Sequence, residues 1–159
     1  MTSADFIALS PYITLSITSI IIMLVIAFYR NHRLTVVLTL AGFAFTIASF
    51  PGASEVLPRA VTPLLIVDRY ALFYTGLIVA AGFSVAALSY SYFEKHEGHR
   101  EEFYLLLLLA TLGCTVLSAA THFASFFLGI ELLSVSLYAL AAYLRHSDKS
   151  VEAGVKYLI

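Results

Sequence analysis

Charged residues are scarce in this chain of 159 residues. Only 12% of the residues are Asp, Glu, Lys or Arg, whereas a soluble domain carries about 25%. Hydrophobic residues make up 60% of the chain, and the mean hydropathy is +0.91. Because a soluble protein with so few charges would struggle to cover its own surface, the composition predicts a protein whose solvent is lipid.

Other absences exclude several classes of function. The single cysteine, Cys114, excludes an internal disulfide, and its place in an apolar run is typical of a small buried hydrophobic residue. The formal net charge of −1 offers no basic patch to a nucleic-acid partner. The chain also lacks a Gly-rich phosphate-binding loop, a pair of haem ligands and a cysteine cluster. We therefore expect this chain itself to bind no cofactor and no metal ion.

Long runs of apolar residues dominate the sequence. A helix that crosses the roughly 30 Å hydrocarbon layer needs about 20 such residues. The pattern predicts an all-α fold, a polytopic transmembrane bundle with five complete spans. A sixth helix begins near Asp148 and is cut off at Ile159, so we expect residues 1–159 to be a single transmembrane domain and part of a longer protein. The first run is too long for a secretory signal and follows no positive charge, so it is expected to be retained. The runs cover residues 12–29, 34–50, 70–93, 103–120 and 122–144.

The Lys and Arg residues of the short loops predict the orientation. Cytoplasmic loops carry an excess of these residues, and one side of the predicted bundle holds six of them against two on the other. The N-terminus is therefore expected outside. The loop over residues 51–69 is expected to be an ordered segment on the outer side, and residues 94–102 a solvated cytoplasmic turn. The richer side carries Arg30, Arg33, Lys95, Arg100, Arg145 and Lys149, and the other carries Arg59 and Arg69.

Glu131 is an acidic residue in the middle of the fifth run. It follows His122 by nine residues, which places it roughly 13 Å into a helix. An acidic group at this depth costs at least about 2.5 kcal/mol, and such residues usually serve function. Ser134 and Tyr138 lie near its helical face, whereas His122 lies opposite and is expected at the interface. The alternative is a protonated Glu131 that only joins two helices by a hydrogen bond.

Lys156 is the second candidate. Glu152 precedes it by four positions, a spacing at which two helical side chains meet. The residues alone leave open whether the two form a surface pair at the membrane edge or a functional site.

Six short segments together form a recognisable pattern. They are residues 67–74 (VDRYALFY), 101–106 (EEFYLL), 118–123 (SAATHF), 127–134 (FLGIELLS), 137–143 (LYALAAY) and 150–157 (SVEAGVKY). With these segments the chain resembles one family, subunit N of bacterial respiratory complex I, the proton-pumping NADH:quinone oxidoreductase. The resemblance is most specific from Glu101 to Tyr157, and it extends more loosely to the first two spans. The chain departs from the common pattern at Thr121, Val135 and Ser136.

The resemblance implies a proton-translocating subunit of the antiporter-like type. Glu131 matches the glutamate of the fifth helix, which in the family faces lysines, and Lys156 matches the lysine near the start of the sixth helix. The two would form a proton relay, with Ser134 and Tyr138 as supporting polar groups. The family has about fourteen helices, with lysines in the seventh and later ones, so this chain alone is not expected to pump.

The resemblance also implies partners and a location. The partners would be other membrane-arm subunits and phospholipid in the bacterial inner membrane, and NADH, FMN, iron–sulfur clusters and quinone would bind to partner subunits. Two alternatives remain. The chain could belong to a multi-component sodium/proton antiporter, or it could be a helical spacer whose Glu131 is structural.

Overall fold

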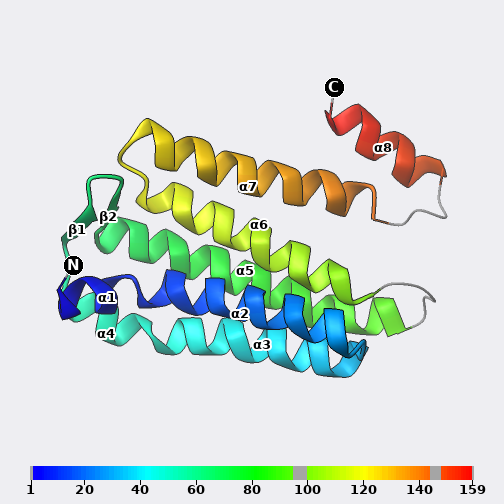
Figure 1. The fold of residues 1–159 in the computed structure, drawn as a ribbon, viewed down its shortest axis with the longest axis horizontal. Helices are drawn as coiled ribbons and strands as arrows, with labels where there is room; N and C mark the ends of the chain where they lie inside the picture. The colour runs from blue at the N-terminus through cyan, green and yellow to red at the C-terminus, as the bar shows by residue number, and fades with distance from the viewer. Residues whose placement is uncertain (1, 95–99, 144–147, 159) are drawn as a thin grey trace.

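The computed structural model describes residues 2–94, 100–143 and 148–158, which form helices joined by short connections and one small hairpin (Figure 1). The all-α prediction is confirmed, and within the described residues five helices are long and apolar enough to cross a membrane. The elements, in chain order, are α1 (Ser3–Ala8), α2 (Ser10–Phe28), α3 (His32–Ala48), α4 (Phe50–Glu55), β1 (Arg59–Thr62), β2 (Leu65–Val67), α5 (Arg69–Glu94), α6 (Glu101–Ala119), α7 (Phe123–Ala141) and α8 (Asp148–Leu158).

Two span ends differ from the predicted ones by three residues or more. The second span was expected to end at Phe50, but α3 continues through α4 as one apolar segment, His32–Glu55. Pro51 lies in the first turn of α4, where the missing N–H of a proline removes no helical hydrogen bond. The fifth span ends at Ala141 and not at Leu144. Tyr143 leaves the helix, and its hydroxyl accepts a hydrogen bond from the Phe103 N–H at 3.0 Å.

The core of the bundle lies among α2, α3, α5 and α6. Its buried residues include Leu15, Phe43, Val79 and Leu108, which share one hydrophobic cluster. By contrast, many large apolar side chains on the outer faces are exposed, among them Leu88 at 78%. A monomeric soluble protein rarely shows apolar patches of this extent. The outward faces are therefore surfaces for lipid or for other membrane helices.

Residues 51–69 form the ordered connection that the sequence predicts, but with a hairpin that it does not predict. The strands β1 and β2 are antiparallel, and a bulge interrupts their register between Ala60 and Thr62. The tip of the hairpin is tied to the α6–α7 connection. The Leu64 carbonyl accepts hydrogen bonds from the Thr121 N–H at 3.1 Å and from the Ser125 hydroxyl at 2.7 Å. These bonds join the hairpin to the α6–α7 connection and to the first turn of α7, which lie far from it in the sequence.

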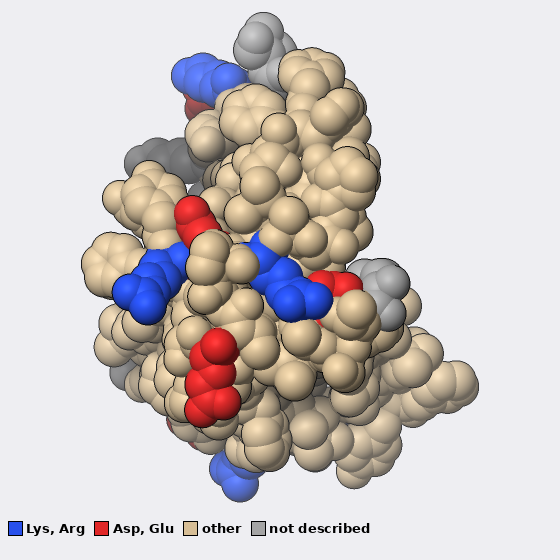
Figure 2. Space-filling model, turned by 90° about the vertical axis from the view of Figure 1, so that its left-hand side faces the viewer, with Lys and Arg blue, Asp and Glu red and all other residues tan. Residues whose placement is uncertain are grey.

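The end of the bundle with α1, α4 and the hairpin carries charges of both signs. Figure 2 looks onto this end and shows acidic and basic side chains interspersed on a mostly uncharged surface. Arg59 donates to the Asp5 carboxylate at 2.5 Å and to the Thr2 hydroxyl at 2.6 Å, which ties β1 to α1. The Thr2 N–H and the Arg59 side chain lower the pKa of Asp5 to about 2.

The basic residues lie at both ends of the bundle, and successive spans run in opposite directions, as the predicted orientation requires. Arg59 and Arg69 lie at the hairpin end, and Arg30, Arg33 and Arg100 lie at the opposite end of the helices. Lys95 and Arg145 lie outside the described residues. The assignment of the richer end to the cytoplasm, with the N-terminus outside, stays a prediction.

Candidate functional site

Glu131 lies at the middle of α7. The helix begins at Phe123 and ends at Ala141, so Glu131 is its ninth residue and lies about 12 Å along the axis from its start. Its side chain is exposed in this chain. Among the described residues, Glu131 has neither a hydrogen-bond partner nor an ion-pair partner. The mid-span carboxylate that the sequence predicts is therefore present, on a face that the described helices leave open.

The opposite face of α7 is held tightly against α6. A Cβ atom added at Gly113 of α6 would lie 2.7 Å from the backbone nitrogen of Leu133 and 3.0 Å from the carbonyl oxygen of Gly129. The two helix backbones thus touch, a contact that small residues permit in membrane helices. Gly129 and Ser136 are buried on this face. Because each residue turns the helix by about 100°, Glu131 points away from α6.

Ser134 and Tyr138 lie near the face of Glu131, as the helical spacing predicts. Both are half-buried. The Tyr138 ring packs edge-on against the Tyr157 ring of α8, with centroids 5.4 Å apart. The helices α7 and α8 also approach closely near Gly154, where an added Cβ would lie 2.5 Å from the Ala142 Cβ. The polar face of α7 therefore ends, on its C-terminal side, under α8 (Figure 1).

Lys156 pairs with Glu152 on α8, at 2.5 Å between Nζ and Oε1. The side chains are 74% and 62% exposed, so the predicted i, i+4 contact is present as an exposed pair. No ion pair joins Lys156 to Glu131 in the described part of the chain. A role for Lys156 in a relay stays a prediction.

His122 is a helix cap and not a member of the site. Its Nδ1 accepts a hydrogen bond from the Ala124 N–H at 3.2 Å, at the N-terminus of α7. The side chain is exposed, and its expected place at the membrane interface stays a prediction. Cys114, which was expected to be buried, is free and only half-buried.

The sequence did not predict a set of buried and half-buried hydroxyl groups that meet between helices. Tyr12 Oη and Thr75 Oγ1 hydrogen-bond at 3.2 Å, and Thr75 Oγ1 and Ser118 Oγ lie 3.3 Å apart, so the three link α2, α5 and α6. The sequence does carry one sign of such hydroxyl groups on a neighbouring helix. Thr35, Thr39 and Thr46 recur at helical spacing along α3, and all three are fully buried. Nothing in the sequence joins Tyr12 to Thr75, which is 63 positions away.

Five helices long and apolar enough to cross a membrane, with a carboxylate halfway along one of them, define a multi-pass helical membrane bundle with an ionisable group in the middle of one helix. Residues 120–159 match the family described as NADH:quinone oxidoreductase/Mrp antiporter, transmembrane. This segment includes all of α7 and α8, and so all four candidate residues.

The chain is also similar to a chain in a solved structure, respiratory complex I from Thermus thermophilus with bound aureothin. The similarity covers 93% of the present chain with a TM-score of 0.78 and 28% identity. The chain spans 32% of the length of that chain, about a third. Both similarities are to membrane proteins of the NADH:quinone oxidoreductase and Mrp antiporter group.

Proposed function

We propose that the chain is part of a proton-translocating membrane-arm subunit of an NADH:quinone oxidoreductase, of the subunit N type, in a bacterial inner membrane. The observation that carries this proposal is the position of Glu131, which lies at mid-span within the segment that matches the antiporter family. A carboxylate at this depth is costly, and such residues mark ion pathways and proton relays in membrane proteins.

In the proposed mechanism Glu131 exchanges a proton as the charge near it changes. The low dielectric of the span disfavours the carboxylate, whereas a cation at its open face favours it. Approach of a lysine would hold Glu131 ionised, and its withdrawal would leave an unpaired buried charge that takes up a proton. Ser134 and Tyr138 would supply hydroxyl groups along this face, and Lys156 would tune the exchange from α8.

The redox chemistry belongs to other subunits in this proposal. NADH, FMN, iron–sulfur clusters and quinone would bind to partner subunits, and this chain would contribute the proton path alone. Its partners would be the neighbouring membrane-arm subunits and phospholipid.

The test is Glu131→Gln in the assembled complex, which removes the titratable group and preserves its shape. NADH-driven proton pumping would be measured in inverted membrane vesicles, with NADH oxidation by an artificial acceptor as the measure of assembly. We expect pumping to fall at least about tenfold, since loss of a positioned proton-transfer group typically costs 10²- to 10⁴-fold, while acceptor activity persists. The matched control is Glu55→Gln on α4, an exposed carboxylate near the hairpin end, which should leave pumping unchanged. If Glu131→Gln pumps as well as the control variant, Glu131 is a structural group.

The second candidate is a subunit of a multi-component sodium/proton antiporter, which the description of the matching family also names. In that case Glu131 would serve an exchange driven by an ion gradient. Sodium-driven proton movement without NADH would favour the antiporter, and co-purification with flavin and iron–sulfur subunits would favour the oxidoreductase.

A further inference from the structure

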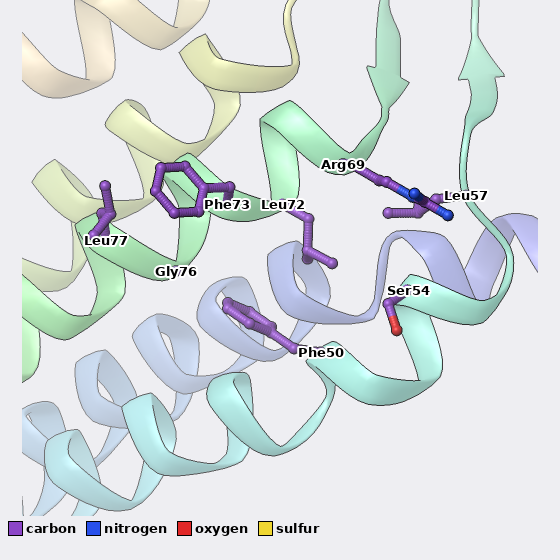
Figure 3. Close-up of a pocket in the computed structure, with 8 residues that line it drawn as sticks. All are labelled: Phe50, Ser54, Leu57, Arg69, Leu72, Phe73, Gly76 and Leu77. Atoms are coloured by element: carbon purple, nitrogen blue, oxygen red, sulfur yellow. The ribbon is translucent and has the colours of Figure 1, made fainter.

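A groove of about 590 Å³ lies between α4 and the first turns of α5, away from Glu131. Figure 3 shows its lining, with Phe50 on one side and Leu72, Phe73 and Leu77 of α5 on the other. Phe73 and Leu77 are 62% and 53% exposed, so the groove opens on the outer face of the bundle. Its volume lies in the range of small-molecule sites, about 300–1,000 Å³.

The shape of the groove follows from a glycine. An added Cβ at Gly76 would lie 3.0 Å from the Phe50 ring, so the ring rests directly on the backbone of α5. A larger side chain at position 76 would fill this space. The ring and the glycine therefore form part of the apolar end of the groove.

The other end of the groove is polar. Arg69 begins α5, and Ser54 of α4 also lines the groove. Leu77 lies eight residues after Arg69, which is about 12 Å along the helix axis. Since α5 crosses the bilayer, the groove runs from the membrane boundary at Arg69 toward the hydrocarbon at Leu77.

The charge of Arg69 is not neutralised within the described residues. No carboxylate there lies within ion-pair distance of its guanidinium, whereas the neighbouring Arg59 is bound to Asp5. The adjacent Asp68 caps α5 instead, because its Oδ1 accepts a hydrogen bond from the Ala71 N–H at 2.7 Å. An anion at this end would meet an available cation that can form two parallel hydrogen bonds.

We propose that this groove binds one phospholipid, with its phosphate at Arg69 and an acyl chain along Phe50, Phe73 and Leu77. A phospholipid has the same order of groups along the membrane normal, a phosphate at the boundary and a hydrocarbon chain below it. An apolar protein helix would fill the groove but leave the charge of Arg69 without an anion. The site does not depend on the proton-translocation proposal, since it requires only that α5 crosses a membrane.

The experiment uses the assembled protein in vesicles of phosphatidylethanolamine and phosphatidylglycerol. A small fraction of the phospholipid carries a photoreactive diazirine on its acyl chain, and labelled peptides are mapped by mass spectrometry. We expect labelling of residues 50–57 and 69–77 that falls about tenfold in Arg69→Gln, because a charge-assisted hydrogen bond of this kind contributes about one decade in affinity. Arg69→Lys, which keeps the charge but cannot form two parallel hydrogen bonds, should lose less labelling than Arg69→Gln. Arg33→Gln, an exposed arginine at the opposite end, should retain most of the labelling.

Three results would overturn the proposal. Labelling that is equal in wild type and Arg69→Gln would mean that the cation does not recognise the phosphate. Absence of label on both peptides in the wild type would mean that the groove holds no phospholipid. A photoreactive phenylalanine analogue at position 73 that crosslinks to another protein segment would mean that protein occupies the groove.

Discussion

The contact between α6 and α7 predicts that Gly113→Ala destabilises the bundle. The added Cβ would lie 2.7 Å from the Leu133 nitrogen, and ordinary contact begins at 3.4 Å, so the helices must separate by about 0.7 Å at this point. The obstructing atoms are backbone atoms and cannot rotate away. A gap of 0.5–1 Å forfeits about a quarter to a half of the dispersion attraction of the contacts that it opens.

The expected loss of stability in Gly113→Ala follows from two opposing effects. Overpacking of a tight core costs about 1–3 kcal/mol, and replacing glycine by alanine within a helix returns up to about 1 kcal/mol. We therefore expect Gly113→Ala to lower the free energy of unfolding by about 1–2 kcal/mol. Gly129→Ala should cost less, because its nearest obstacle at 2.9 Å is the flexible Leu117 side chain.

Gly52→Ala is the matched control. A Cβ at Gly52 would meet only Ile7, at 3.9 Å, which is ordinary contact. This variant should be neutral or more stable by up to about 1 kcal/mol. Unfolding of the purified protein, titrated with denaturing detergent and followed by loss of helical circular dichroism, measures all three variants. If Gly113→Ala were as stable as Gly52→Ala, the helix backbones would not be in contact as the structure has them.

Two further predictions concern single polar groups. The pKa of Asp5 is lowered from 3.8 to about 2 in the folded chain, so its stabilising contribution is present above pH 4 and is lost as the pH falls toward 2. Asp5→Asn should lower the midpoint of thermal unfolding in detergent at pH 7, and it should flatten the dependence of this midpoint on pH between 4 and 2. If wild type and Asp5→Asn lost stability in parallel over this pH range, the prediction would be wrong. The Tyr104 hydroxyl is buried and has no hydrogen-bond partner among the described residues, so Tyr104→Phe should change the free energy of unfolding by less than about 0.5 kcal/mol. Tyr12→Phe breaks the bond to Thr75 and should lower the free energy of unfolding by about 0.6 kcal/mol. A loss above about 1 kcal/mol in Tyr104→Phe would reveal a bound partner of the hydroxyl, such as an internal water.

The spans were predictable because their signal is local. A run of about 20 apolar residues can be satisfied in lipid only as a helix that pairs its own backbone groups, so the runs indicate both the element and its approximate ends. The position of Glu131 halfway along its helix followed from the same count. The hairpin was not predictable, because β1 and β2 have only four and three residues. The hairpin is held by hydrogen bonds that the Leu64 carbonyl accepts from the distant Thr121 and Ser125.

The sequence also could not predict which helix packs against each helix face. Gly113 and Gly129 lie sixteen positions apart, and only the antiparallel packing of α6 on α7 makes them neighbours. The same limit applies to the candidate site. The spacing of Glu131, Ser134 and Tyr138 predicts a shared face, but which helix lies opposite is a property of the packing. In the structure, α8 meets that face at Tyr138 and leaves Glu131 open.

The open face of Glu131 sets a physical requirement on whatever covers it. In lipid, this carboxylate would cost at least about 2.5 kcal/mol, and α6 cannot relieve the cost because it packs against the opposite face of α7. Lys156 forms an exposed ion pair with Glu152 and has no ion pair with Glu131 either. The cover must therefore supply water, a hydrogen-bond donor or a cation. A cation that moves, or water that exchanges a proton with the carboxylate, would couple the covering group to proton transfer, whereas a fixed hydrogen-bond donor would not. Glu131→Gln removes the exchangeable proton and keeps the hydrogen-bonding shape, so this variant, more than any change in α8, separates a proton path from a structural hydrogen bond.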